Sequence, residues 1–355
     1  MSDCCNNSTV GQGTEDALFI SRGVSRRALL KRMGSVAGAA ALAGLPACSS
    51  GGGETVKLAF CSQLLCVAPY EATRAAGFFA EEGLDVQLVY SRGGSAAVQA
   101  LNAGGVDYAA TSFDAALNAF ANGANVMRFA TTGRLPLFAL ATGPHTADGI
   151  RSIDDLKGKT VGVAQLGNSD HALMLYLLEQ NGIDSDSVNF AILGPNLYDA
   201  LRLGQVDAGM VQEPGLTLLQ REGARVLVNL MTTEDAKRYL GGAYEFMGVA
   251  VRPDEAEQRR EQMQKIGRAL TAGMEYMQQA PIEDIIDALP DELVAGGDME
   301  VLAKALAEYR ASLYPSSVQI SRDACDSVMK AHLLADIQKE PVNMDQLLNQ
   351  SVLGA

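Results

Sequence analysis

The stretch that decides the fold is Ala100-Leu-Asn-Ala-Gly-Gly-Val-Asp107, which returns one hundred residues later as Ala200-Leu-Arg-Leu-Gly-Gln-Val-Asp207. Each copy ends a helical pattern at a glycine and enters a strand pattern through Val-Asp. Helix–turn–strand punctuation of this kind occurs in any α/β protein. A shared A-L-x-x-G-x-V-D pattern at one fixed offset nevertheless favours an internal repeat, and therefore two related lobes.

Strand and helix patterns alternate around both copies of the repeat. In the first half, strands are predicted at 55–60, 86–90 and 106–110, with helices at 68–82 and 95–103. In the second half, strands are predicted at 135–140, 160–163, 225–228 and 246–251, with a helix at 170–181. This alternation predicts an α/β protein in which each lobe is a mainly parallel sheet flanked by helices.

After Pro253 the pattern becomes wholly helical. The apolar residues step by three and four positions, which is typical of helices with one buried face, as in Met263, Ile266, Leu270, Met274 and Met277. We interpret this methionine stripe as core filling and not as a ligand surface. The helical C-terminal segment is expected to pack back on the first lobe. Lobe 1 would then comprise 55–132 plus 252–355, and lobe 2 would comprise 133–251.

Composition and charge exclude several classes of protein. The chain has 355 residues, and its 48% hydrophobic and 20% charged content is typical of globular proteins. Lys and Arg number 28 against 42 Asp and Glu, a formal net charge of -14. Such an acidic chain, with no basic run beyond its first 35 residues, is a poor nucleic-acid binder. No run of 18 apolar residues follows the N-terminal region, so the body is not expected to span a bilayer.

The N-terminal region has the three parts of an export signal. The pair Arg26-Arg27 precedes a short Ala/Gly/Leu-rich stretch at 33–45, and small residues follow it. The paired arginines resemble a twin-arginine signal, although Leu29 stands where that pattern usually has Phe. We therefore predict that residues 1–47 are a twin-arginine-like lipoprotein signal peptide.

A lipid anchor is predicted directly after this signal. Leu45-Pro46-Ala47-Cys48 resembles a lipoprotein box, in which the cysteine is lipidated and becomes the first residue of the mature chain. Residues 48–54 would be the lipidated Cys48 and a flexible Gly/Ser-rich tether. The protein is then expected to be exported and held by lipid on the outer face of the cytoplasmic membrane.

Ligands of open α/β sheets bind beyond the carboxyl ends of the strands, and two facing lobes form a cleft there. The candidate ligand-binding residues follow predicted strands; they are Ser62, Gln63, Arg92, Gly94, Ser95, Thr111, Ser112, Phe113, Asp114, Gln165, Asn168, Ser169, His171, Asn196 and Glu213. Small residues before helices expose N–H groups that suit an anion or a polar oxygen, although plain helix capping explains the same residues.

Recognisable catalytic motifs are missing from the sequence. It has no G-x-S-x-G, no P-loop, no H-E-x-x-H and no G-x-G-x-x-G after a strand. The histidines at 145, 171 and 332 lack the spacing of metal ligands. We therefore expect no enzymatic activity, no cofactor and no metal site. Cys61 and Cys66 flank the first loop, and a disulfide between them remains open as an alternative to two thiols.

With these loops placed, the sequence resembles the solute-binding proteins of ABC importers, in the nitrate/sulfonate/taurine and pyrimidine-precursor superfamily. The residues that carry the resemblance lie mainly at 68–86, 97–108, 155–163 and 201–214. The resemblance implies the two-lobed type II periplasmic-binding-protein fold. It also implies a monomer that closes on a small solute and docks on a membrane permease.

The resemblance does not identify the ligand. Arg92 is the only cation among the candidate loops, beside Asp114, Asp170 and Glu213, so we favour a neutral, polar or amine-bearing organic solute over an oxyanion. Phe113, Tyr198 or Phe246 could stack on it. Two other functions stay open: a pyrimidine-precursor synthase-like enzyme on the same fold, and a ligand-sensing lipoprotein.

Overall fold

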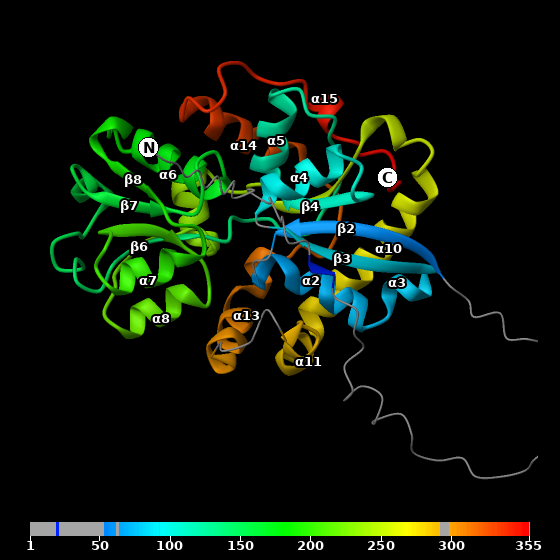
Figure 1. Cartoon of the computed structure of the whole chain (residues 1–355), viewed down its shortest axis with the longest axis horizontal. Coiled ribbons are helices and arrows are strands. Elements are labelled where there is room, and N and C mark those ends of the chain that lie inside the picture. Colours follow the sequence, from blue (N-terminus) through cyan, green and yellow to red (C-terminus); the bar gives the residue numbers. More distant parts are fainter. Residues whose placement is uncertain (1–18, 21–52, 62–63, 92, 292–297, 355) are drawn as a thin grey trace, which may run out of the picture.

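The computed structural model describes residues 19–20, 53–61, 64–91, 93–291 and 298–354 (Figure 1). The predicted lipidation site Cys48 and the candidate ligand-binding residues Ser62, Gln63 and Arg92 lie outside the described residues, as does nearly all of the predicted signal peptide. The described chain forms two α/β halves side by side, each built on its own sheet (Figure 1).

The first sheet has the strand order β1-β3-β2-β4-β11-β5. Its strands are β1 (Phe19–Ile20), β2 (Glu54–Cys61), β3 (Leu84–Ser91), β4 (Tyr108–Ser112), β5 (Met127–Thr131) and β11 (Met247–Val251). β2 pairs in parallel with β3 and β4, whereas β11 is antiparallel to β4 and β5. The parallel centre agrees with the α/β pattern of the sequence.

The second sheet has the order β10-β6-β9-β7-β8. Its strands are β6 (Ala139–Thr142), β7 (Thr160–Val163), β8 (Asn189–Ile192), β9 (Ala208–Val211) and β10 (Val226–Asn229). β7 pairs in parallel with β8 and β9, and β6 joins the sheet antiparallel to β9 and β10. Both sheets thus have a parallel core, which antiparallel strands extend on both sides in the first sheet and on one side in the second. This confirms the predicted fold class.

The aspartate of the sequence repeat forms the same hydrogen bond in both halves. Asp107 accepts a hydrogen bond from the backbone N–H of Lys57 at 2.8 Å, and Asp207 accepts the equivalent bond from Thr160 at 2.8 Å. Each aspartate therefore ties the start of its own strand to the neighbouring parallel strand. The preceding glycine turns have positive φ, 72° at Gly104 and 69° at Gly204, a conformation that favours glycine.

One predicted assignment is wrong. The strand at 246–251 was expected in lobe 2, but β11 lies between β4 and β5 of the first sheet, so lobe 2 ends before this strand and not at 251. β11 and β5 lie so close together that a Cβ on Gly248 would be 2.1 Å from the Ala130 carbonyl oxygen. An apolar strand pattern shows burial but not which sheet it joins, and this explains the error.

Helices cover both sheets. They are α2 (Leu64–Ala75), α3 (Phe78–Glu81), α4 (Gly94–Asn102), α5 (Phe113–Ala121), α6 (Ser169–Gln180), α7 (Leu197–Arg202), α8 (Gly215–Arg221), α9 (Thr233–Asp235), α10 (Arg260–Gln279), α11 (Ile282–Asp287), α13 (Met299–Leu313), α14 (Arg322–Leu334) and α15 (Met344–Leu347). Short 3₁₀ or π turns are η1 (Ile153–Leu156), η2 (Ser185–Ser187), η3 (Gly194–Asn196), η4 (Ala236–Leu240) and η5 (Pro253–Glu255). No described helix is both long enough and apolar enough to cross a bilayer.

The C-terminal helices return to the first lobe, as predicted, but they also reach the second. α10 packs on α2 and α3, and its apolar stripe from Met263 to Met277 is fully buried. α14 contacts α5 of the first half and α6 of the second, and α13 contacts α8. These helices therefore span the junction between the halves as well as covering the first sheet (Figure 1).

Candidate ligand-binding site

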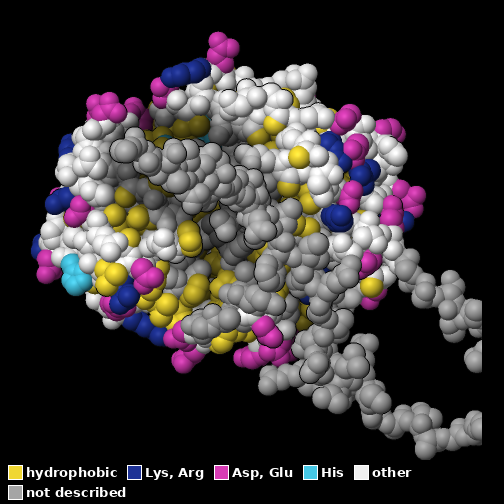
Figure 2. Space-filling model, in the orientation of Figure 1, with side chains coloured by type: hydrophobic (Ala, Val, Ile, Leu, Met, Phe, Trp, Pro, Cys, Tyr) yellow, Lys and Arg dark blue, Asp and Glu magenta, His cyan; other side chains and the backbone are white. Residues whose placement is uncertain are grey.

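A cavity of about 30 Å³ lies between the two halves. Its walls come from the carboxyl ends of β2 and β4, the first turns of α2, α4 and α6, and the segments that connect the sheets. The lining residues are Cys61, Cys66, Gly94, Ser112, Phe138, Asn168, Ser169, Asp170, Phe246 and Met247. In the view of Figure 2, charged side chains gather around the periphery of the molecule, while hydrophobic ones are more frequent nearer its middle.

Hydrogen bonds across the cavity hold the halves together. Ser169 Oγ donates to Ser112 Oγ at 2.6 Å, and Ser95 Oγ donates to Asn168 Oδ1 at 3.0 Å. These contacts join the two halves directly, and the space that remains at the cavity is small. The structure is therefore a closely joined arrangement of the two halves, which would have to separate to admit a larger organic solute.

Three helices begin at the cavity. Ser112 caps α5 by accepting a hydrogen bond from the Ala115 N–H at 3.2 Å, and α6 begins at Ser169. α4 begins at Gly94, where a Cβ would lie 2.3 Å from Thr111 Oγ1, so this helix start packs directly on β4. Helix N-termini carry partial positive charge and unpaired N–H groups, which favour polar oxygens and anions.

Asp170 is the only Asp, Glu, Lys or Arg among the described residues that line the cavity. Its Oδ2 atom accepts a hydrogen bond from the Ala164 N–H, which closes the loop between β7 and α6. Burial raises the pKa of Asp170 to about 6, although hydrogen bonds from backbone N–H groups oppose that shift. The described wall of the cavity thus contains one carboxyl group, which backbone N–H groups hold in place.

Several candidate residues lie together at the cavity. Gly94, Ser112, Asn168 and Ser169 line it, and Ser95 contacts it through Asn168. Thr111 and Phe113 are fully buried beneath the cavity and do not line it.

Asp114 is also displaced from its expected role. It is fully buried, and its Oδ1 atom accepts hydrogen bonds from Tyr244 Oη at 2.6 Å and His332 Nε2 at 3.1 Å. Its partners come from a connecting segment and from α14, neither of which the sequence places near residue 114. The structure therefore gives Asp114 a packing role behind the site.

The second-lobe candidates are more dispersed than expected. Gln165 and Asn196 are exposed, and neither lines the cavity. His171 packs against Phe190 with ring centroids 5.0 Å apart, and burial lowers its pKa. The Glu213 side chain is directed to the first turn of α8, where it accepts hydrogen bonds from the Thr217 N–H at 3.1 Å and from Thr217 Oγ1 at 3.0 Å. Burial raises the pKa of Glu213.

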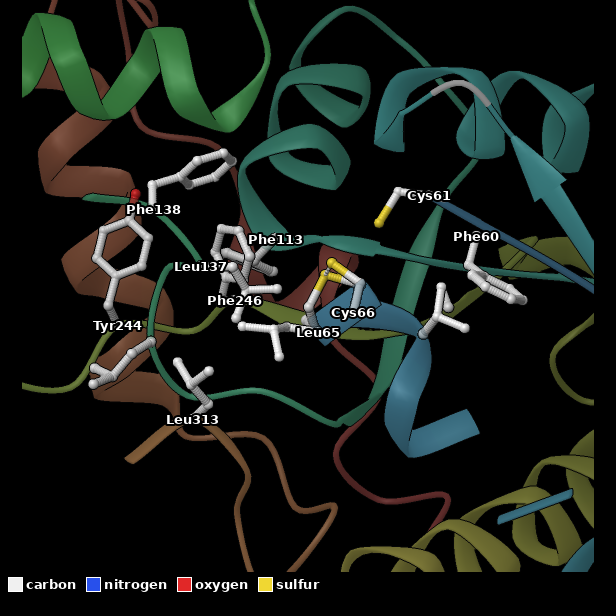
Figure 3. Packing of buried hydrophobic residues seen from close by; sticks show 14 of the residues in the cluster. Phe60, Cys61, Leu65, Cys66, Phe113, Leu137, Phe138, Tyr244, Phe246 and Leu313 are labelled. Atoms are coloured by element: carbon white, nitrogen blue, oxygen red, sulfur yellow. Dashed lines mark hydrogen bonds between the residues drawn. The ribbon is translucent and has the colours of Figure 1, made fainter. Parts of the chain in front are cut away.

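The sequence does not single out the lining residues Phe138 and Met247, and it suggests Phe246 only as one of three possible stacking residues. Phe246 lines the cavity and meets Phe138 edge-to-face, with ring centroids 6.0 Å apart (Figure 3). The third stacking candidate, Tyr198, lies elsewhere, with its hydroxyl directed to Glu222 at 3.4 Å. Phe138 lies in the segment that links β5 to β6, and Met247 is the first residue of β11. No local pattern distinguishes either residue from ordinary core residues.

Cys61 and Cys66 lie on the wall formed by the first half (Figure 3). Both are buried thiols in the structure, as is Cys325. Cys66 Sγ donates a hydrogen bond to Met247 Sδ at 3.5 Å. Burial and hydrogen bonding to the Cys61 thiol raise the pKa of Cys66 well above its ordinary value, so its thiol stays protonated at neutral pH.

Known proteins share this architecture. A protein from Bordetella bronchiseptica RB50 superposes with a TM-score of 0.74 at 25% identity, over 84% of this chain and 95% of that one. The periplasmic aliphatic sulphonate binding protein SsuA from Escherichia coli superposes with a TM-score of 0.63 at 20% identity, over 84% of this chain and 92% of that one. The protein YtlA of Bacillus subtilis (strain 168) is 23% identical over 267 residues, covering 72% of this chain and 75% of YtlA.

These likenesses confirm the periplasmic solute-binding fold that the sequence predicted. The model of the NMT1/THI5-like family matches residues 67–284, which is more than half of the chain. The matched region contains the parallel core of the second sheet, most of the first sheet except β1 and β2, and every described residue of the cavity wall except Cys61 and Cys66. The chain therefore belongs to the NMT1/THI5-like family.

Proposed function

We propose that the protein captures a small solute outside the cytoplasm by closing its two lobes, and delivers it to an ABC permease. The observation that carries this proposal is the cavity between the sheets, which serine and asparagine side chains from both halves close by hydrogen bonds. Closure of two lobes around a ligand by hinge motion is the general behaviour of periplasmic binding proteins.

Export and anchoring complete this proposal. Residues 1–47 would direct export, Cys48 would carry the lipid, and 48–54 would tether a monomer to the outer face of the cytoplasmic membrane. Lobe 1 would then comprise 55–132 and the chain from β11 onward, with lobe 2 between them.

The ligand we favour is a neutral, polar or amine-bearing organic molecule. The described cavity wall offers the Asp170 carboxyl, serine hydroxyls and two edge-to-face phenyl rings, and it offers no Lys or Arg. An oxyanion is the second candidate, because three helices begin at the cavity and the Escherichia coli relative is a sulphonate binding protein. A role without chemistry is favoured, because the Escherichia coli relative is a binding protein and the sequence has no recognisable catalytic motif.

The test is a thermal-shift screen of the full chain with amines, pyrimidines, sulfonates and nitrate, in the presence of a metal chelator. A bound solute at about 1,000 times its Kd stabilises the folded state by about 4 kcal/mol. Asn168→Ala is expected to abolish that gain, because Asn168 lines the cavity and accepts the hydrogen bond from Ser95.

The matched control is Gln180→Ala, which removes an amide from the exposed far end of the same helix. It is expected to bind like the parent chain. If no compound class stabilises the protein, or if Asn168→Ala binds as tightly as the control, this cavity is not the solute site.

A further inference from the structure

We propose that the sulfur atoms of Cys61, Cys66 and Met247 form a binding site for one soft monovalent metal cation of the Cu(I) class. This site goes beyond solute capture, since it occupies one wall of the cavity and needs no partner from the second lobe. The three residues come from β2, α2 and β11, and all of them line the same cavity.

The sulfur atoms already lie near the spacing that such a site requires. Cys66 Sγ and Met247 Sδ are 3.5 Å apart, and the Cys61 thiol is hydrogen-bonded to Cys66. With a metal–sulfur bond of about 2.3 Å, three sulfur ligands in a trigonal plane stand about 4 Å from one another. The Cys66–Met247 pair therefore needs to widen by only about 0.5 Å to hold a cation, and the Cys61 thiol lies beside this pair.

The size of the cavity favours an ion. The space that remains at the cavity is about 30 Å³, which admits water-sized bodies such as a metal ion and is small for an organic molecule. A cation can thus bind while the Ser112–Ser169 and Ser95–Asn168 hydrogen bonds stay intact.

The donor atoms decide the class of metal. Thiolate and thioether sulfur select soft cations such as Cu(I), whereas carboxylate and water select hard ones. In the described part of the chain, no three His, Cys, Asp or Glu side chains are grouped to hold a metal. The third donor at this site is therefore the Met247 thioether, a ligand that zinc sites do not use but Cu(I) accepts.

Metal binding changes the charge of the site. The two thiols release two protons when the metal–thiolate bonds form, and a monovalent cation then leaves one net negative charge at the site. Cys66 lies in the first turn of α2, and α4, α5 and α6 also begin at the cavity. Their N-terminal partial charges favour this extra negative charge. The rings of Phe138 and Phe246 border the site and limit the access of water.

The experiment uses the full chain with Cys4, Cys5 and Cys48 replaced by serine, so that only the three described thiols remain. Ag(I) serves as the redox-inert probe, and Cu(I) is measured anaerobically by competition with a chromophoric chelator. We expect one equivalent to bind tightly. Cys61→Ser and Cys66→Ser are expected to weaken binding by more than the about 10- to 100-fold that outer-shell changes cost.

Two further variants make the test specific. Met247→Leu keeps the side-chain volume and removes the thioether, and it is expected to weaken binding at least about 10-fold. Cys325→Ser removes a buried thiol that does not line the cavity, and it is expected to bind like the parent. X-ray absorption of the Cu(I)-loaded parent is expected to show three sulfur neighbours.

The proposal is overturned if Met247→Leu binds as tightly as the parent, if Cys325→Ser weakens binding as Cys61→Ser does, or if absorption shows only two sulfurs. None of these results affects the solute screen, which contains chelator. A failed solute screen likewise leaves the metal measurement unchanged.

Discussion

Asp114→Ala is expected to destabilise the protein strongly and to leave solute affinity unchanged. The carboxylate is fully buried and accepts hydrogen bonds from Tyr244 at 2.6 Å and His332 at 3.1 Å. Alanine removes the acceptor and leaves two buried donors without it. Each buried donor that loses its acceptor costs about 1–3 kcal/mol, so the two together are expected to cost about 3–5 kcal/mol.

This free energy can be converted into a shift in melting temperature. Unfolding entropy is about 2.1 cal/mol/K per residue, so roughly 300 folded residues give about 1.6 °C for each kcal/mol. The expected loss is therefore about 5–8 °C, measured by differential scanning calorimetry at neutral pH. Solute affinity is measured in parallel by isothermal titration and is expected to stay within about 3-fold of the parent value.

Asp199→Ala is the matched control. Asp199 is 60% exposed and pairs with Arg202 at 3.2 Å, and such surface pairs contribute less than about 1 kcal/mol. It is expected to lower the melting temperature by less than about 2 °C. If Asp114→Ala lowers it no more than this control, the buried network does not stabilise the fold. A large loss of solute affinity at wild-type stability would return Asp114 to the binding site.

Two further predictions concern the site and the first sheet. The pKa of Asp170 is about 6 in the folded protein and about 3.9 in the unfolded chain, so its ionisation destabilises the fold as pH rises between these values. The melting temperature of Asp170→Asn, relative to that of the parent, is therefore expected to be higher at about pH 7.5 than at about pH 5. A difference in melting temperature that does not vary with pH would contradict this reasoning. Gly248→Ala places a Cβ 2.1 Å from the Ala130 carbonyl oxygen, so overpacking is expected to cost about 1–3 kcal/mol in urea unfolding, whereas wild-type stability would show that β11 can move away from β5.

The α/β class could be predicted because its signals are local. The repeat at 100–107 and 200–207 places a positive-φ glycine and a strand-linking aspartate in each half, and both copies form the same hydrogen bond. Likewise, the apolar stripe of α10 follows from helical periodicity alone. The glycine turns and the helical stripe depend on residues within a few positions of one another, where sequence patterns are most informative. The two aspartate hydrogen bonds instead join residues 50 and 47 positions apart, and the structure supplied them.

The candidate site was predicted only in part. Gly94, Ser112, Asn168 and Ser169 lie at the cavity because they follow strands whose carboxyl ends meet there. Asp114 follows a strand too, but its side chain turns inward to Tyr244 and His332. Position after a strand therefore predicts proximity to the site, and it does not predict where a side chain points.

The sequence by itself determined the alternation of strands and helices, the duplication of the two lobes and the loops that approach the cleft. The tertiary structure alone decided that β11 joins the first sheet, that Asp114 is buried, and that Met247 contacts a cysteine 181 positions away. The physical reason is that helical periodicity and turn chemistry act between near neighbours. Strand pairing and side-chain contacts between distant segments instead depend on how the whole chain packs, which no local pattern records.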